Sequence, residues 1–253
     1  MKKVRIGIVG AGNIATNAHM PAYKVCDQAE IAAVADLNLE RAQAFAEKFG
    51  IPHAYGSVEE MLANEDIDAV DICTWNCGHA PVAIAAAKAG KHILCEKPFA
   101  DSLEHAREAK EAIEKAGVTF LLGVPSRFNP PNALARKMLD DGELGDIYYA
   151  KTSYLRRRGT PTGWFTDSRV SGGGPVLDIG VHRIDAAWYL MGNPKPVRVS
   201  SAVANHLGEY ETKGITRWQG TPCPDNQNNT EDFGAGVIHF ENGALLAFED
   251  AWA

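Results

Sequence analysis

Apolar runs and helical stretches alternate along residues 1–123. Each run is rich in Val, Ile, Leu or Ala and short enough for a buried strand, and the stretches between the runs have helical periodicity. Regular alternation of strand and helix is typical of a parallel sheet with helices on both faces, which is a doubly wound α/β unit. The predicted strands are residues 4–9, 30–35, 69–73, 92–95 and 119–122, and the predicted helices are residues 14–23, 39–49, 58–63, 81–89 and 102–116.

The pattern changes after Gly123. Asn242-Gly243 lies between two apolar runs and is a strong hairpin signal. We therefore expect a second, α+β domain over residues 124–253, built on a mainly antiparallel sheet and used for substrate binding or oligomerisation. Residues 206–230 have no clear period and predict a long loop of the kind that borders a site. The predicted strands are residues 147–155, 197–204, 233–240 and 244–248, with helices at residues 132–140 and after the glycine run at 172–174.

The composition is that of an ordinary globular protein, with 45% hydrophobic and 23% charged residues. A net charge of −7 argues against nucleic acid or an acidic membrane surface as the main partner, because both favour a basic face. No segment approaches the ~18 apolar residues of a membrane span. Glycines interrupt the first apolar run before it forms a signal peptide, so we expect a cytoplasmic protein. The five cysteines lack zinc-site or C-x-x-C spacing, so we expect neither a metal site nor a disulfide framework.

The first predicted strand and helix are joined by the sequence Gly10-Ala11-Gly12-Asn13-Ile14-Ala15, which has the G-x-G-x-x-[G/A] pattern of a dinucleotide site. Gly10 permits the tight turn, and Gly12 lets the backbone approach a pyrophosphate. The free N–H groups at the start of the helix, around Asn13 and Ile14, then meet the phosphates. This arrangement predicts a Rossmann domain over residues 1–123.

Asp36 ends the next predicted strand at about the distance expected for the residue that binds the adenosine ribose. A carboxylate at this position accepts both ribose hydroxyls and repels a 2′-phosphate, which favours NAD. Arg41 lies one helical turn further on and leaves NADP possible.

Several motifs together resemble the Gfo/Idh/MocA family of oxidoreductases, which includes glucose–fructose oxidoreductase and inositol dehydrogenase. The resemblance implies a nicotinamide-dependent dehydrogenase or reductase that acts on sugars, cyclitols or related polyols. It covers nearly the whole chain, with two departures: Trp75 replaces the usual proline, and family members normally continue past Ala253, so the second domain is expected to be incomplete. The motifs are Gly7–Ala15, Thr74-Trp75-Asn76 with His79, Ala89–His92, Glu96-Lys97-Pro98 and the second-domain signature at residues 172–182.

The resemblance places Thr74, Asn76, His79, Glu96 and Lys97 near the cofactor. Lys97 should lie at the carboxyl end of its strand, where doubly wound sheets bind cofactors. The alternative for Lys97 is a solvated lysine, and Glu96 either orients Lys97 or forms a structural ion pair. The bond before the proline that follows Lys97 is a candidate cis peptide.

Asp178 and His182 lie four residues apart in a predicted helix and share one face with Asp185 and Tyr189. The other positions of this helix are apolar, so the polar stripe needs a polar cavity or partners. The alternative is an Asp–His pair with a purely structural role. The family signature around the pair favours catalysis.

The mechanism that these residues suggest is hydride transfer from an alcohol to nicotinamide. His182 accepts the hydroxyl proton, because imidazole titrates near neutral pH. Lys97 stabilises the developing alkoxide, and Asp178 binds a neighbouring hydroxyl or sets the histidine tautomer.

Arginine and aromatic side chains supply weaker candidates. Arg127 follows the last Rossmann strand and either binds cofactor, as a similar arginine does in the family, or braces the domain hinge. The run Arg156–Arg158 is solvated or ion-paired, or one of the three reaches the site and favours an acidic sugar. Trp164 and Phe165 either wall a sugar site or pack in the core.

Two other functions stay open. One is a non-catalytic regulator that senses NAD(P) or a sugar, and the other is a glycoside-cleaving enzyme that uses NAD transiently. The presence of Lys97, Asp178 and His182 together argues against the regulator. We expect a sugar or polyol as the small-molecule partner, and a homo-oligomer, because the exposed face of an antiparallel sheet often pairs with a second copy.

Overall fold

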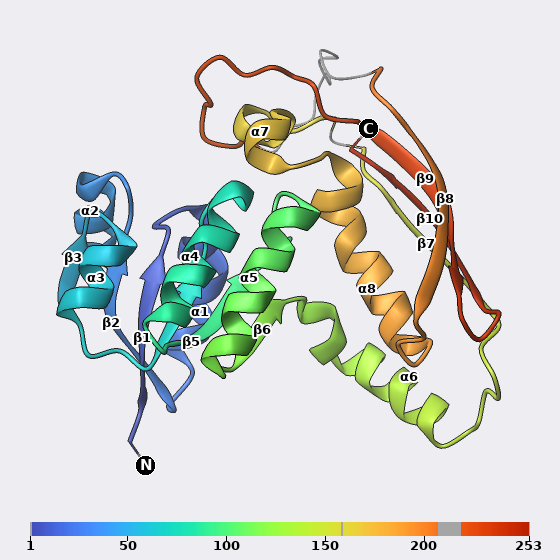
Figure 1. Ribbon diagram of the computed structural model, residues 1–253, viewed down its shortest axis with the longest axis horizontal. Helices are drawn as coiled ribbons and strands as arrows, with labels where there is room; N and C mark the ends of the chain where they lie inside the picture. The colour runs from blue at the N-terminus through green and yellow to red at the C-terminus, as the bar shows by residue number, and fades with distance from the viewer. Residues whose placement is uncertain (1, 158, 207–218, 253) are drawn as a thin grey trace. The chain divides into compact units, whose positions relative to one another are not determined.

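A computed structural model describes residues 2–157, 159–206 and 219–252. The chain divides into two compact units, Met1–Gly123 and Val124–Ala253 (Figure 1). Among the described residues, no helix is both long enough and apolar enough to cross a membrane. Each unit is built around a sheet of its own.

The first unit contains a six-stranded sheet in the order β3-β2-β1-β4-β5-β6, with every neighbouring pair parallel. The strand order reverses between β1 and β4, and ligands of doubly wound folds bind beside such a reversal, at the carboxyl ends of the strands. The strands are β1 (Val4–Val9), β2 (Ala29–Ala35), β3 (His53–Tyr55), β4 (Ala69–Ile72), β5 (His92–Glu96) and β6 (Phe120–Gly123).

Helices cover both faces of this sheet because successive strand residues point in opposite directions. Ile8 packs into one buried cluster with Val34 and Phe45, and its neighbour Val9 packs into the other with Ile72. The helices are the π-helical segment η1 (Ala15–His19), α1 (Met20–Lys24), α2 (Leu39–Phe49), α3 (Val58–Asn64), α4 (Asn76–Lys88) and α5 (Leu103–Ala116).

Two helices of the first unit differ from the sequence prediction. The expected helix 14–23 contains the π-helical segment η1, and α4 begins at Asn76 instead of Pro81. Pro81 lies inside α4 although it lacks an N–H, and the burial of small apolar residues such as Ala80 and Ala83 offsets the lost hydrogen bond. The earlier start places Asn76 and His79 in the first turn after β4.

The second unit contains a four-stranded sheet in the order β7-β10-β9-β8. β10 pairs antiparallel with β9 and parallel with β7, and β9 pairs antiparallel with β8, so the sheet is mixed with two antiparallel pairs of three. The hairpin predicted at Asn242-Gly243 forms, with Gly243 at a φ of 85°. The strands are β7 (Tyr149–Leu155), β8 (Pro196–Ala204), β9 (Phe233–Phe240) and β10 (Leu245–Ala251).

Helix α8 (Val181–Leu190) packs on this sheet (Figure 1), where Ile184, Ala187 and Trp188 contact a core that contains Phe240 and Leu246. A π-helical segment, η4 (Val176–Gly180), leads directly into α8. The remaining helical elements of this unit are η2 (Pro125–Phe128), α6 (Pro130–Asp140), η3 (Gly163–Thr166) and α7 (Ser168–Ser171). The predicted fold class, a Rossmann unit followed by an α+β unit, is confirmed.

The predicted loop 206–230 lies partly outside the described residues, which omit 207–218. Its described part returns to η3, where the Asn226 amide donates hydrogen bonds to the Gly163 carbonyl at 3.0 Å and to the Thr166 hydroxyl at 2.9 Å. This part of the loop is therefore fastened to the second unit.

Candidate active site

The glycine turn after β1 has the geometry that the sequence pattern requires. Gly10 has a φ of 100°, and a Cβ atom there would lie 2.6 Å from the carbonyl oxygen of Cys73, so only glycine fits. A Cβ atom on Gly12 would meet no atom of the described residues within 4 Å. Asn13 and Ile14 are exposed where the helix begins. The open backbone face and the helix N-terminus suit a pyrophosphate.

Asp36 is buried at the end of β2, and its carboxylate is attached to the glycine turn. It accepts hydrogen bonds from the N–H groups of Ala11, at 2.9 Å, and Asn38, at 2.8 Å. Arg41 donates to both carboxylate oxygens, at 2.9 and 2.6 Å. These four donors occupy the lone pairs of the carboxylate, so ribose hydroxyls would take the places of the half-exposed Arg41 side chain.

His79 joins the two loops that follow β4 and β5. Its ring is fully buried, with Nδ1 2.6 Å from the Pro98 carbonyl oxygen and Nε2 3.1 Å from the Thr74 carbonyl oxygen. Burial lowers the pKa of His79, and its hydrogen bonds with the two carbonyls oppose this effect. Asn76, one turn earlier, is also buried. Both ring nitrogens of His79, which was predicted to contact the cofactor, thus face backbone carbonyls of the two loops.

Lys97 follows β5, and the Lys97–Pro98 bond is cis, as the sequence suggested. The side chain of Glu96 folds back on this segment, where its Oε2 atom accepts a hydrogen bond from the Lys97 backbone N–H at 3.1 Å. Glu96 therefore contacts the main chain that carries Lys97. β1, β4 and β5 are neighbours in the sheet, so their carboxyl ends place the glycine turn, Thr74 and Lys97 at one edge.

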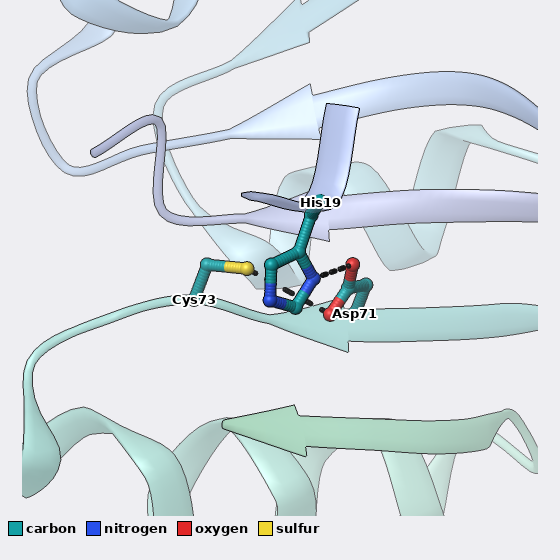
Figure 2. Close-up of side chains that lie close together, drawn as sticks. All are labelled: His19, Asp71 and Cys73. Carbon is teal, nitrogen blue, oxygen red and sulfur yellow. Dashed lines mark hydrogen bonds and ion pairs between the residues drawn. The ribbon is translucent and has the colours of Figure 1, made fainter. Parts of the chain in front are cut away.

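A group of side chains lies at this end of β4 and β5, and Glu96 is its one member predicted from the sequence. We call it the His19 cluster: His19, Tyr23, Asp71, Cys73 and Glu96. His19 Nδ1 is 2.7 Å from Asp71 Oδ2, and His19 Nε2 is 3.0 Å from Glu96 Oε1. The Tyr23 hydroxyl donates to Asp71 at 2.9 Å. Figure 2 shows the His19 ring beside Cys73 and the Asp71 carboxylate.

The charges of this cluster depend on its hydrogen bonds. Burial opposes a charge on His19, but its interactions with Asp71, Cys73 and Glu96 as acceptors outweigh this effect and raise the pKa of His19 to about 12. Burial likewise raises the pKa of Glu96, and the hydrogen bond and charge of His19 bring it below the ordinary value. Burial raises the pKa of the Cys73 thiol to about 12.

The same atoms raise the question of a metal. One ligand atom each from His19, Asp71 and Cys73 lie within 4.8 Å of one another, a group that cysteine spacing did not reveal. Both nitrogens of His19, however, already lie at hydrogen-bond distance from carboxylate oxygens. Besides Glu96, the sequence signal for this cluster is Asp71, a carboxylate inside an apolar strand, which must find partners when buried.

In the second unit, Asp178 lies in η4 and His182 in the first turn of α8. The fully buried Trp252 donates its indole N–H to Asp178 Oδ2 at 3.0 Å, and an Arg156 guanidinium nitrogen lies 3.9 Å from the same oxygen. The prediction of an uninterrupted α-helix is wrong here. The Val181 N–H bonds to the carbonyl five residues back, a π-helical bond, so Asp178 and His182 do not follow ordinary i,i+4 spacing.

Asp250 on β10 is a second polar group that the sequence analysis missed. It is fully buried, and neither carboxylate oxygen has a hydrogen-bond partner among the described residues. A Cβ atom on Gly180 would lie 2.4 Å from one of these oxygens, so the carboxyl group packs against η4. Burial, aided by Glu249 and opposed by Arg183, raises the pKa of Asp250 to about 7.

The weaker arginine candidates separate in the structure. Arg127 forms two hydrogen bonds with Asp185, at 2.8 and 2.5 Å, and lies over the Trp188 and Tyr189 rings, so it braces the second unit. Of the run Arg156–Arg158, Arg156 approaches Asp178, its neighbour is exposed, and Arg158 lies outside the described residues.

The aromatic pair Trp164 and Phe165 is stacked, with ring centroids 4.1 Å apart. Both side chains are partly buried, in the element that the loop 206–230 returns to. Phe165 contacts the described part of this loop, since a Cβ atom on Gly220 would lie 2.9 Å from its ring.

Comparison with known families covers both units. Residues 4–124 match an oxidoreductase family with an NAD-binding Rossmann fold, and residues 133–253 match the GFO/IDH/MocA C-terminal domain.

Comparison with individual proteins gives the same result. D-glucoside 3-dehydrogenase of Escherichia coli is 34% identical over 99% of this chain and 70% of its own length. The structure of levoglucosan dehydrogenase with NADH and levoglucosan matches 99% of this chain and 67% of its own, with a TM-score of 0.86 and 28% identity. An aldose-aldose oxidoreductase from Caulobacter crescentus matches 99% of this chain and 71% of its own, with a TM-score of 0.83 and 29% identity.

Proposed function

Since the chain belongs to the Gfo/Idh/MocA family of NAD-binding oxidoreductases, we propose that it oxidises a hydroxyl group of a sugar or related polyol, or reduces the corresponding carbonyl. The observation that carries this proposal is the position of Lys97. It follows the strand next to β4 at the sheet edge that carries the glycine turn, and Glu96 holds its main chain. A lysine there places a cationic donor where cofactors of this fold bind.

The substrate class is supported by what similar proteins act on. D-glucoside 3-dehydrogenase and levoglucosan dehydrogenase both take sugar derivatives, and a myo-inositol 2-dehydrogenase of Thermotoga maritima is 32% identical over 75% of this chain. All three names describe oxidation of a ring compound that carries several hydroxyl groups. We therefore propose a sugar or cyclitol hydroxyl as the reacting group.

The chemistry is divided among three side chains. Lys97 donates a hydrogen bond to the substrate oxygen and stabilises the negative charge that develops on it. His182 accepts the hydroxyl proton. Asp178, which is held by Trp252 and Arg156, binds a neighbouring hydroxyl. When NAD is bound, its nicotinamide supplies the hydride acceptor.

The cofactor would be held by the glycine turn and by Asp36. The N–H groups after Gly12 would bind the pyrophosphate, and the Asp36 carboxylate would accept the ribose hydroxyls. Arg41, already on Asp36, would meet a 2′-phosphate if NADP were used. NAD is the cofactor that the family fold specifies.

The second unit is proposed to bind substrate and to pair with a second copy. Its outer strand β8 exposes Val197, Val199 and Val203, each more than half accessible. Apolar side chains exposed along one strand favour association. Sedimentation of the protein tests this, and a monomer would contradict it.

The test is a panel of sugars and polyols, each with NAD and with NADP, followed by absorbance of the reduced cofactor. With a confirmed substrate, Lys97→Ala is expected to lower kcat by roughly 10²- to 10⁴-fold. Lys88→Ala, at an exposed lysine of α4, is the matched control and should retain turnover. Near-normal turnover of Lys97→Ala would overturn the assignment, and release of reducing sugar without net NADH would identify a glycoside-cleaving enzyme instead.

A further inference from the structure

Of the His19 cluster, only Glu96 has a part in the function proposed above, through its hydrogen bond to the Lys97 main chain. The side chains of the cluster come from separate elements: His19 from η1, Tyr23 from α1, Asp71 from β4, Cys73 from the end of β4 and Glu96 from β5. A buried group of this kind costs stability unless every charge is matched, so its contacts define what it does.

We propose that His19 is a permanently protonated positioning residue, which holds Glu96 between two fixed hydrogen bonds and so fixes the main chain that carries Lys97. This inference rests on the proposed function, because it assigns His19 to the same reaction. His19 does not touch substrate or cofactor in this proposal, and it acts only through Glu96.

The hydrogen-bond partners of His19 require a proton on each of its ring nitrogens. The two ring nitrogens of His19 face Asp71 Oδ2 at 2.7 Å and Glu96 Oε1 at 3.0 Å. Ionised carboxylate oxygens only accept hydrogen bonds, so both nitrogens must donate, and an imidazole with two N–H groups is a cation. Asp71 is in turn held by Tyr23, which fixes the ring from the far side.

A single side chain, Glu96, connects the His19 ring to the main chain of Lys97. Glu96 uses Oε1 to accept from His19 and Oε2 to accept from the Lys97 N–H at 3.1 Å. Gly123 on β6 borders Glu96 closely, since a Cβ atom there would lie 3.2 Å from Oε1. The Glu96 side chain is therefore held in one position, with the His19 ring at one carboxylate oxygen and the Lys97 backbone N–H at the other.

A metal ion is the competing occupant of this cluster. It would have to replace the proton on one nitrogen of His19 and take the thiolate of Cys73, whose pKa burial raises to about 12. The hydrogen bonds already satisfy both ring nitrogens. Protonated His19 thus accounts for the geometry without an ion.

The first test needs no substrate. In protein with ¹⁵N-labelled histidine, with His19 assigned through His19→Gln, both ring nitrogens are expected to stay protonated from pH 6 to pH 9. The titratable groups that face the ring are Asp71, Cys73 and Glu96, and the Tyr23 hydroxyl faces Asp71. A neutral ring at pH 8, or one equivalent of tightly bound metal in the purified protein, would overturn the proposal.

The second test asks whether His19 acts through Glu96. His19→Gln is expected to lower kcat by roughly 10- to 100-fold, the effect of losing a hydrogen bond to a charged group, with little change in the KM for NAD. His105→Gln is the matched control, because it removes an exposed His–Asp pair of 2.6 Å and should leave kcat unchanged.

A double-mutant cycle separates positioning from general support of the fold. If His19 works through Glu96, the double variant His19→Gln/Glu96→Gln should lose no more activity than Glu96→Gln alone. Additive losses would overturn the proposal. If no substrate is found, the proposed function fails while the histidine spectrum still decides the protonation of His19.

Discussion

Glu96 in the first unit and Asp250 in the second are both carboxyl groups withdrawn from water, and they respond in opposite ways. Burial raises the pKa of each. At Glu96 the hydrogen bond and charge of His19 reverse the effect and bring the pKa below the ordinary value. At Asp250 no described residue donates a hydrogen bond, and the pKa rises to about 7. Burial thus favours the neutral form of a carboxyl group, and a buried donor that carries a charge favours the ionised form.

The difference indicates where the protein maintains charge. Glu96 is kept ionised beside Lys97, which carries the proposed chemistry. Asp250 is packed against Gly180 in η4, the segment that also contains Asp178. The charge of Arg183 lowers the pKa of Asp250 by less than burial raises it. In the first unit, a network of matched charges and hydrogen bonds therefore surrounds Glu96 at the proposed active site. In the second unit, Asp250 lacks such a network, and its neutral form is easier to bury.

The largest effect should come from breaking the matched network. Asp71→Asn removes the charge that His19 and Tyr23 both face, and leaves a buried cation with one partner fewer. We expect the free energy of unfolding to fall by about 3–5 kcal/mol at pH 7, the range for breaking a buried ion pair. Urea unfolding measures it. A loss under ~1 kcal/mol would show that His19 and Asp71 do not form a matched buried ion pair.

Replacing Asp250 is expected to change the free energy of unfolding in the opposite direction. Its pKa is about 7 in the folded protein against 3.8 ordinarily, so the folded state binds the proton more tightly. The stability that this proton provides is complete below pH ~4 and is lost as the pH rises towards 7. Asp250→Asn should therefore raise the free energy of unfolding at pH 8, by about 4 kcal/mol, and have little effect at pH 4.

Urea unfolding at the two pH values checks this prediction. Glu241→Gln removes an exposed carboxylate of the same unit and should change stability by less than ~0.5 kcal/mol at either pH. A destabilised Asp250→Asn protein at pH 8 would mean that Asp250 is charged and partnered.

A smaller effect should follow at Asp178, a carboxylate with a neutral donor. Trp252→Phe keeps an aromatic ring and removes the N–H that donates to Asp178 at 3.0 Å. One such hydrogen bond is worth about 1 kcal/mol, so kcat/KM should fall roughly 5- to 10-fold with a confirmed substrate. Steady-state kinetics on the sugar identified by the panel provide the measurement, and unchanged kcat/KM would separate Trp252 from the function of Asp178.

The sequence predicted those parts of the site that depend on neighbouring residues. Gly10, Gly12 and Asp36 belong to one strand–turn–helix–strand segment, and Lys97 follows a recognisable strand, so motif and alternation located them. The His19 cluster could not be found in this way, because His19 is 52 residues from Asp71 and 77 from Glu96. Such contacts exist only after the sheet has formed.

The two π-helical segments escaped prediction for a related reason. Apolar periodicity does not distinguish a helix with one inserted residue from an ordinary one over a few turns. The predicted i,i+4 spacing of Asp178 and His182 therefore does not hold. The start of α4 differs for another reason: proline is favoured in the first turn of a helix, and here Pro81 lies inside the helix. Trp252, in turn, is coupled to Asp178 across 74 residues.

The most direct test of the contrast is a pH titration of the side-chain carboxyl carbons of Glu96 and Asp250 by ¹³C NMR, each assigned through its amide variant. Glu96 should remain ionised to a pH below its ordinary 4.5, and Asp250 should titrate with a midpoint near 7. If Glu96 titrates at a higher pH than Asp250, or if both titrate at their ordinary values, then His19 does not keep Glu96 ionised.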